Sequence, residues 1–322
     1  MFKLAMRTDE QPYGTLLILA PVWLVAFILS LGGCTHTDKP DQTFNEEAYR
    51  AQIKQWRADR IKSLKADDGW LNLAGLFWLE KGTYRFGSDP SNDLVFPDKA
   101  AGMIGTLRVA DSTVTLKVND GVAVTYRDNP VERMKIWSET QSEQLVLSHG
   151  SLRFFIIERD QGRLAVRLRD LDHPNLQSFD GLEYFPIDTT WRVKATFVPY
   201  RPAKTIEIPT VYGTVRERLT PGALEFSIEG TTYSLDPVVS GEDDPFFVIF
   251  SDETNGETTY SGGRFLYVER PGSDGTTVID FNKAYSPPCA FTEFATCPLP
   301  PADNRFSLEI TAGEKTTTLN GH

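Results

Sequence analysis

The residue types best suited to chemistry are concentrated in one segment near the C-terminus, Arg264–Pro301. Asp280 and Asn282 stand on either side of Phe281 at the end of an expected strand, so both side chains point to one face. A carboxylate beside an amide and a tyrosine can bind a polar ligand or act as a general base. The candidate ligand-site residues are Arg264, Asp280, Asn282, Lys283 and Tyr285. The structural alternative is an ion pair between Asp280 and Arg264, with Asn282 capping a turn.

Other catalytic patterns are missing from the sequence. The stretch Val239-Ser240-Gly241 lacks the Gly-x-Ser-x-Gly motif of a nucleophile elbow, and the four histidines are scattered. No glycine-rich phosphate loop or metal-spaced cluster occurs either, so we expect no metal and no cofactor. The enzymatic alternative is a hydrolase that uses carboxylates, with Asp280 and either Asp188 or Glu183 as acid and base.

Two further groups of residues admit a binding role beside a structural one. Asp89, Asn92 and Asp93 have the oxygen atoms to ligate calcium, but they fit a polar turn equally well. Four aromatic residues could stack against sugars, although such residues are more often part of a core. These four are Trp70, Phe77, Trp78 and Trp191.

The N-terminus predicts a lipoprotein leader. Positive charge near the start is followed by the uncharged run Leu16–Gly33. Leu31-Gly32-Gly33-Cys34 resembles a bacterial lipobox, in which small residues fit the signal peptidase and the cysteine receives lipid. A transmembrane helix is the alternative, since the run is just long enough to span a bilayer. We expect a signal peptide over residues 1–33 and lipidation at Cys34.

The residues after the leader indicate a location in the cell envelope. Thr35 follows the cysteine where aspartate would favour retention in the inner membrane, so we expect the periplasmic face of the outer membrane. Residues 34–43 are polar, as in a flexible tether. In an oxidising compartment, the nearby Cys289 and Cys297 are most simply a disulfide.

Composition narrows the class of partner. The chain has 322 residues and a formal net charge of −11, which argues against a nucleic-acid partner because the phosphate backbone repels a negative surface. The length after the leader is enough for two domains with separate cores.

Periodicity predicts one helix followed by an all-β chain. Apolar residues recur at helical spacing from Phe44 to about Ala66, and Gly69 ends this segment. From Trp70 onward the period is two, with turn residues between short apolar runs; Val114, Leu116 and Val118, for example, alternate with polar residues. Short strands are expected at 191–198, 205–208 and 306–310, among others, and the turn-rich segment 173–186 is expected to bridge two modules. We expect an amphipathic helix in residues 44–69 and two β-sandwich or barrel modules, 70–178 and 179–322.

From about Trp56 to the C-terminus, the chain carries several motifs that resemble an uncharacterised bacterial family known as domain of unknown function 1684. They are Gly69-Trp70-Leu71-Asn72-Leu73, Gly75-Leu76-Phe77-Trp78-Leu79, Phe86-Gly87-Ser88, Gly263-Arg264-Phe265-Leu266, Asp280-Phe281-Asn282-Lys283-Ala284-Tyr285, Pro287-Pro288-Cys289-Ala290-Phe291 and Cys297-Pro298-Leu299-Pro300-Pro301. The resemblance implies no activity and no catalytic residues.

A weaker resemblance, over about residues 82–170, is to forkhead-associated domains. Phe86-Gly87-Ser88, Ser91–Val95 and Arg167–Asp170 are similar to their strand and loop motifs. Ser88 stands where those domains carry a phosphate-contacting arginine, which implies a similar sandwich without phosphothreonine recognition. The sequence thus favours a non-enzymatic envelope protein that binds a glycan, peptide or protein; the alternatives are the hydrolase and a purely structural scaffold.

Overall fold

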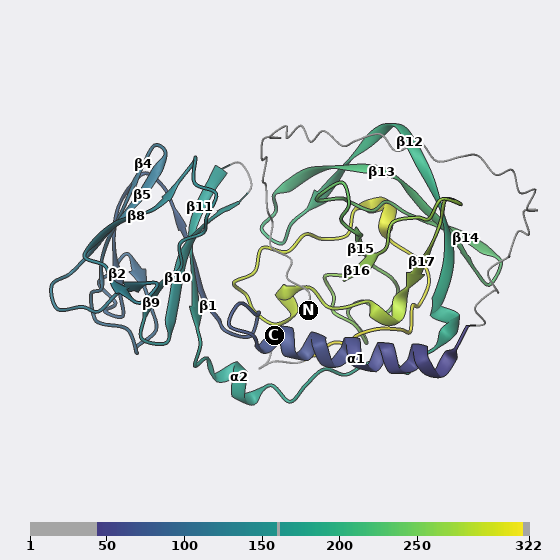
Figure 1. Ribbon diagram of the computed structural model, residues 1–322, viewed down its shortest axis with the longest axis horizontal. Coiled ribbons are helices and arrows are strands. Elements are labelled where there is room, and N and C mark those ends of the chain that lie inside the picture. Colours follow the sequence, from purple (N-terminus) through teal and green to yellow (C-terminus); the bar gives the residue numbers. More distant parts are fainter. Residues whose placement is uncertain (1–43, 160–161, 318–322) are drawn as a thin grey trace, which may run out of the picture. The chain divides into compact units, whose positions relative to one another are not determined.

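The structure, a computed structural model, describes residues 44–159 and 162–317, drawn as coloured ribbon in Figure 1. The predicted signal peptide, the lipidation at Cys34 and the tether lie outside the described residues. From residue 46 onward the chain forms one compact unit. This unit is mostly β-sheet and contains several sheets, as the sequence predicts.

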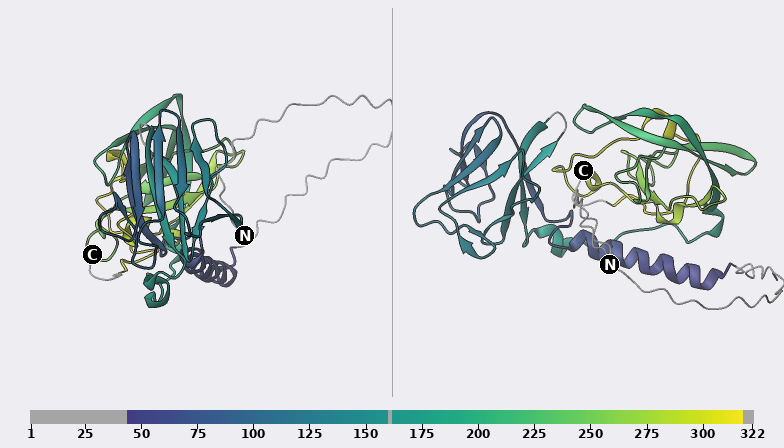
Figure 2. Two further views of the ribbon diagram at one scale, coloured as in Figure 1. Left: turned by 90° about the vertical axis from the view of Figure 1, so that its left-hand side faces the viewer. Right: turned by 45° about the horizontal axis from the view of Figure 1, so that its top comes forward.

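Helix α1 spans Glu46–Lys65 and runs without a break in Figure 1 and in the right-hand view of Figure 2. Glutamates in its first turn and lysines in its last turn complement the helix dipole. Gly69 follows in a tight turn, where a Cβ atom would lie 2.3 Å from the Leu64 carbonyl oxygen. Because that distance is far below van der Waals contact, only glycine fits. Within the part of the chain that the structure describes, no helix combines the length and apolar character needed to cross a membrane.

Residues 73–170 form two sheets. One has the strand order β1-β11-β10-β9-β6-β7, and the other has the order β3-β2-β4-β5-β8. The strands of the first sheet are β1 (Leu73–Leu79), β6 (Thr125–Tyr126), β7 (Asn129–Pro130), β9 (Leu147–His149), β10 (Leu152–Arg159) and β11 (Arg163–Asp170). Those of the second are β2 (Gly82–Gly87), β3 (Leu94–Val95), β4 (Gly105–Ala110), β5 (Thr113–Val118) and β8 (Arg133–Ser138).

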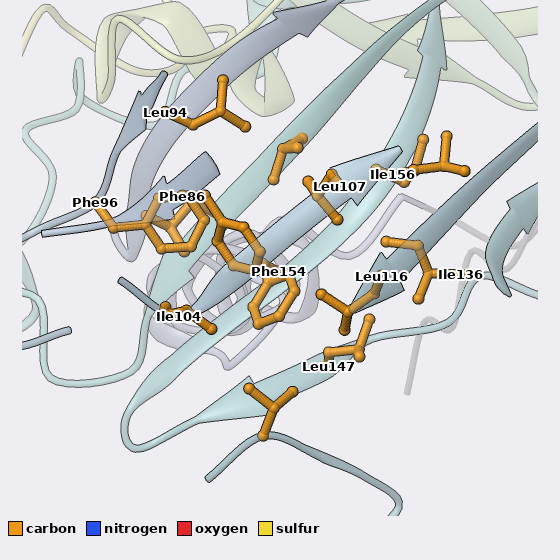
Figure 3. Close-up of a cluster of buried hydrophobic side chains, with 14 of the residues drawn as sticks. Phe86, Leu94, Phe96, Ile104, Leu107, Leu116, Ile136, Leu147, Phe154 and Ile156 are labelled. Atoms are coloured by element: carbon orange, nitrogen blue, oxygen red, sulfur yellow. The ribbon is translucent and has the colours of Figure 1, made fainter. Parts of the chain in front are cut away.

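A single hydrophobic cluster lies between these two sheets. Figure 3 shows Phe86, Phe96 and Phe154 together in it, with ring centroids 5.3–6.0 Å apart. The predicted alternation in β5 is confirmed, because Val114, Leu116 and Val118 are all buried in this cluster. Two sheets with one shared core hold β10 and β11 rigidly enough to position side chains on their outer faces.

The C-terminal half contains a four-stranded sheet, ordered β14-β13-β12-β17, and the β15-β16 pair. The strands are β12 (Arg192–Pro209), β13 (Val215–Ile228), β14 (Thr231–Leu235), β15 (Phe246–Phe250), β16 (Arg264–Val268) and β17 (Thr276–Asp280). The single strand β12 replaces two short strands expected at 191–198 and 205–208, with a register break between Pro199 and Lys204. The strand expected at 306–310 is wrong, since that segment contains no strand.

Short helical segments connect these strands. They are α2 (Pro174–Ser178), η2 (Thr189–Trp191), η3 (Phe281–Lys283), η4 (Pro288–Ala290) and η5 (Ala302–Asn304). Helix α2 falls inside the expected bridge between the two modules, and η3 follows β17 directly. The start of η3 therefore places Asp280 and Asn282 at the point where the sheet ends.

Candidate functional site

The structure brings Asp280 and Asn282 together with Tyr49 of α1. The Tyr49 hydroxyl donates to Asp280 Oδ1 at 2.8 Å and accepts from Asn282 Nδ2 at 2.9 Å. Asp280 Oδ1 also accepts from the Asn282 backbone N–H at 3.2 Å, so Asp280 caps η3. Asn282 donates to the Asp188 carbonyl at 2.7 Å and accepts from the Asp188 backbone N–H at 3.0 Å, so its side chain holds the backbone at the start of η2. All three side chains are buried, so this cluster joins α1 to the sheet and leaves little room for a ligand.

Arg264 lies elsewhere, and the expected Asp280–Arg264 ion pair is wrong. Arg264 is fully buried and pairs with Asp252, with 2.5 Å between Nη2 and Oδ2. It also donates to the carbonyls of Ile310 and Ala312. Burial lowers the Arg264 pKa, and Asp252 opposes this shift. Arg264 is thus a buried ion-paired cation that ties β16 to the C-terminal segment.

Of the two remaining predicted site residues, Lys283 lies beside Asp280 and Tyr285 lies elsewhere. Lys283 Nζ lies 3.9 Å from Asp280 Oδ2. Tyr285 stacks on Tyr267, with 6.3 Å between ring centroids, and the Arg60 guanidinium lies 4.7 Å from its ring centre. Burial raises the pKa of the Tyr285 hydroxyl well above its ordinary value. The five candidates therefore occupy at least three environments and do not converge on one pocket.

The carboxylates considered for acid–base catalysis have structural partners or stand apart. Asp188 Oδ1 accepts from the Thr190 backbone N–H and hydroxyl, both at 2.8 Å, and caps η2. Glu183 is exposed. Within residues 44–159 and 162–317, no group of three or more His, Cys, Asp or Glu residues is arranged to hold a metal ion.

The four aromatic residues do not form a platform. Phe77 stacks on Phe96 in the cluster between the two sheets of residues 73–170. Trp191 instead makes an edge contact with Phe281 in a separate hydrophobic cluster of the C-terminal half. Trp78 contacts Tyr212 edge-on, with 5.8 Å between ring centroids. Of the four, Trp70 lines a pocket, described next.

That pocket, called the arginine pocket below, has a volume of about 350 Å³. It is lined by Trp70, Trp137, Gln141, Ser142, Glu143, Gln144, Phe155, Ile156, Ile157, Glu158, Arg159, Arg167 and Arg169. These residues come from the turn after α1, from β8 and the loop after it, and from β10 and β11. Strand β9 pairs with β10 only as far as Phe154, so the remainder of β10 borders the pocket without that neighbour.

Strand register places the arginines on the outer face of β11. Val166 and Leu168 belong to the core between the two sheets, so the intervening Arg167 points the opposite way, as does Arg169. Arg167 lies opposite Phe155 of β10 in the register. The Arg169 guanidinium is 6.0 Å from the centre of the Phe155 ring. The pocket therefore combines cations with an aromatic surface.

Arg167 is the most constrained of these cations. It is 3% exposed, and its Nε is buried with no hydrogen-bond partner among the described residues. Its Nη2 donates to the Phe294 carbonyl at 3.0 Å. Burial first, and then the charges of Arg159 and Arg169, lower the pKa of Arg167 to about 10. Arg167 thus remains a cation at neutral pH, in surroundings where positive charge dominates.

The other charged groups of the pocket do not neutralise Arg167. Arg169 donates to Asn72 Oδ1 at 2.7 Å and to the Gly69 carbonyl. Burial lowers its pKa to about 10 as well. Of the two carboxylates in the lining, Glu143 is ion-paired with Arg127, and Glu158 is exposed. The pocket is suited to an anion, because an anion would supply the counter-charge that the residues described by the structure do not place beside Arg167.

The disulfide predicted between Cys289 and Cys297 is confirmed. The loop that it closes supplies two acceptors to the arginines of β10 and β11. Thr296 Oγ1 accepts from Arg159 Nε at 3.1 Å, and the Phe294 carbonyl accepts from Arg167. The disulfide loop therefore helps to orient the guanidinium groups.

Sequence reasoning missed the arginine pocket, although one signal was present. Arg167 and Arg169 flank Leu168 in a strand, so they had to share a face. What the pattern does not show is that this face is covered, since Trp70 and the disulfide loop come from distant parts of the chain.

The fold and the pocket define a mostly β-sheet protein with a cationic pocket around the buried Arg167, and comparison with known proteins gives its family. Residues 177–315 match the family described as "Protein of unknown function (DUF1684)". The chain belongs to this family, as the motifs between Gly263 and Pro301 suggested. The motifs between Gly69 and Ser88 lie outside the matched residues. It is 36% identical to an uncharacterised protein of Haloarcula marismortui with a solution NMR structure. That match covers 44% of this chain and 78% of the other, with a TM-score of 0.37. No curated protein matches the chain.

Proposed function

We propose that this protein is a non-enzymatic binding protein of the cell envelope and that its arginine pocket holds a small organic anion. The observation that supports this proposal best is the state of Arg167, which is almost fully buried and has no carboxylate partner among the described residues. Burying an unpaired cation costs free energy. A protein that keeps such a residue loses stability unless a ligand supplies the counter-charge, and a guanidinium binds carboxylate or phosphate through two parallel hydrogen bonds.

The lining of the pocket suggests that the anion has an apolar body. Trp70 and Phe155 supply aromatic surface next to the guanidinium groups. The volume of about 350 Å³ lies at the lower end of the range for small-molecule sites, near the size of one sugar ring with an acidic substituent. An acidic monosaccharide unit of an envelope glycan has both an anionic group and a ring whose apolar faces can stack on aromatic side chains.

The envelope location and the modular architecture belong to the same proposal. The lipobox at Cys34 motivates the first, and the disulfide is consistent with an oxidising compartment. For the second, we propose that residues 70–178 are a β-sandwich similar to forkhead-associated domains and that residues 179–322 are a second β-module. Ser88 Oγ donates to the Ala100 carbonyl, in keeping with a module that does not bind phosphothreonine.

Binding can be tested with matched sugars. N-acetylmuramic acid and N-acetylglucosamine 1-phosphate carry a carboxylate and a phosphate, whereas N-acetylglucosamine has neither. We expect both anions to raise the melting temperature of the protein and the neutral sugar to leave it unchanged, because a ligand that binds only the folded state stabilises it. A shift with one anion alone identifies the acidic group that the pocket accepts.

The matched variants are Arg167→Gln and Arg163→Gln, which remove one cation each from the same strand. Arg163 is exposed and does not line the pocket. Losing a charge-assisted hydrogen bond costs about 1.5–3 kcal/mol, so Arg167→Gln should weaken binding roughly ten- to a hundredfold. The free energy of unfolding of the Arg167→Gln variant without ligand should not fall, because the substitution removes an unpaired buried charge. Equal binding by the two variants, or an equal shift with the neutral sugar, refutes the proposal.

A further inference from the structure

The outer face of the five-stranded sheet carries an ordered array of basic and threonine side chains. Strand pairing aligns Arg85, Thr106, Lys117 and Arg133 in one row across β2, β4, β5 and β8. A second row contains Thr83, Arg108, Thr115 and Lys135. The two rows, called the basic face below, hold five cations and no carboxylate, in a chain whose formal net charge is −11.

The cations of the basic face are mostly left without counter-charges. Arg85 pairs with Asp93, with 3.6 Å between Nε and Oδ2. Among the described residues, no ion pair is found for Arg108, Lys117, Arg133 or Lys135. All four are exposed.

The arrangement of two of these cations is itself unfavourable. Lys117 and Arg133 lie directly opposite one another on neighbouring strands. Like charges at such a pair of positions repel and destabilise the sheet. A pair of this kind adds no stability to the folded protein, but it gives strong local attraction to an anion.

The basic face is hollowed. A depression of about 320 Å³ crosses the strands and is lined by Thr83, Thr106, Arg108, Ala110, Thr113, Thr115, Lys117 and Arg133. Neighbouring strands are about 4.8 Å apart, so the three cations of the first row span about 15 Å. Threonine hydroxyls stand between the cations and can both donate and accept hydrogen bonds.

We propose that the basic face binds a chain of an anionic polysaccharide. The cations match acidic groups repeated along such a chain, and the threonine hydroxyls match its sugar hydroxyls. The depression favours a polymer chain over a flat bilayer, which would meet only the rim. This site is separate from the arginine pocket, and its proposal does not depend on that of the pocket.

The test uses the full chain in neutral detergent and two forms of one polymer. Polygalacturonate carries a carboxylate on each sugar, and its fully methyl-esterified form carries none. We expect binding to polygalacturonate at low salt, loss of that binding at about 0.5 M salt because exposed charges are then screened, and no binding to the ester.

Two double variants with the same change in net charge separate the basic face from the rest of the surface. Lys117→Gln/Lys135→Gln should weaken binding about tenfold, within the range for two exposed ion pairs. Lys54→Gln/Lys194→Gln, at exposed positions on α1 and β12, should leave it unchanged. Equal weakening by both double variants overturns the proposal. The proposal is also overturned if the full chain binds vesicles of anionic lipid but does not bind polygalacturonate, and Lys117→Gln/Lys135→Gln reduces the binding to vesicles. The partner would then be a membrane.

Discussion

Replacing Tyr49 by phenylalanine tests whether the buried cluster around Asp280 joins α1 to the C-terminal sheet. Tyr49 is 6% exposed, and its hydroxyl donates to Asp280 Oδ1 at 2.8 Å. A hydrogen bond to a charged group contributes about 1.5–3 kcal/mol to folding. Asp280 retains the Asn282 backbone N–H at 3.2 Å, so the loss should fall near the lower end, at about 1.5–2 kcal/mol.

The assay is urea denaturation at pH 7, with the free energy of unfolding extrapolated to zero denaturant. Tyr126→Phe is the matched control. The Tyr126 hydroxyl reaches Glu143 at 3.3 Å on an exposed surface, so its loss should change stability by less than about 0.5 kcal/mol. If both variants lose the same small amount, the Asp280 cluster does not hold α1 in place, and the residues of the predicted site would regain a functional interpretation.

Three further predictions concern stability. Asp252→Ala should cost about 3–5 kcal/mol in urea denaturation, because it leaves the fully buried Arg264 without its counter-charge; a loss below 1 kcal/mol would contradict this. Cys289→Ser/Cys297→Ser should cost about 2–3 kcal/mol, the loop-closure term for cysteines separated by 8 positions, and reducing agent should then have no further effect. Above pH 10 the unfolded chain loses the Tyr285 proton while the folded chain keeps it, since burial raises the folded pKa. This residue should therefore lower stability by about 1.4 kcal/mol per pH unit, and Tyr285→Phe should remove that part of the slope between pH 9 and 11.

The sequence pattern was sufficient to predict those structural features that depend on residues close together in the chain. The alternation of Val114, Leu116 and Val118 predicts β5, and the short spacing of Cys289 and Cys297 predicts their disulfide. The helix expected from Phe44 corresponds to α1, which begins two residues later. Each of these features follows from side-chain periodicity or from loop length, both of which can be read directly from the chain.

The sequence pattern did not predict the partner of a buried polar group where that partner is distant in the chain. Asp280 and Arg264 are close in sequence and opposite in charge, yet Tyr49 donates to Asp280 from 231 positions away. Arg264 pairs with Asp252, because the turn between β15 and β16 brings that carboxylate to it. Which opposite charge a buried ion meets is a property of packing and not of spacing.

The sequence by itself determined the mostly-β class, the family and the disulfide. The tertiary structure alone decided that Arg167 is buried, that it donates to the Phe294 carbonyl, and that Trp70 lines the same pocket from a distant segment. It also showed that the cations of four strands align on the basic face. The physical reason is that periodicity fixes which side of a strand a residue occupies, whereas strand register and the packing of loops decide what that side meets.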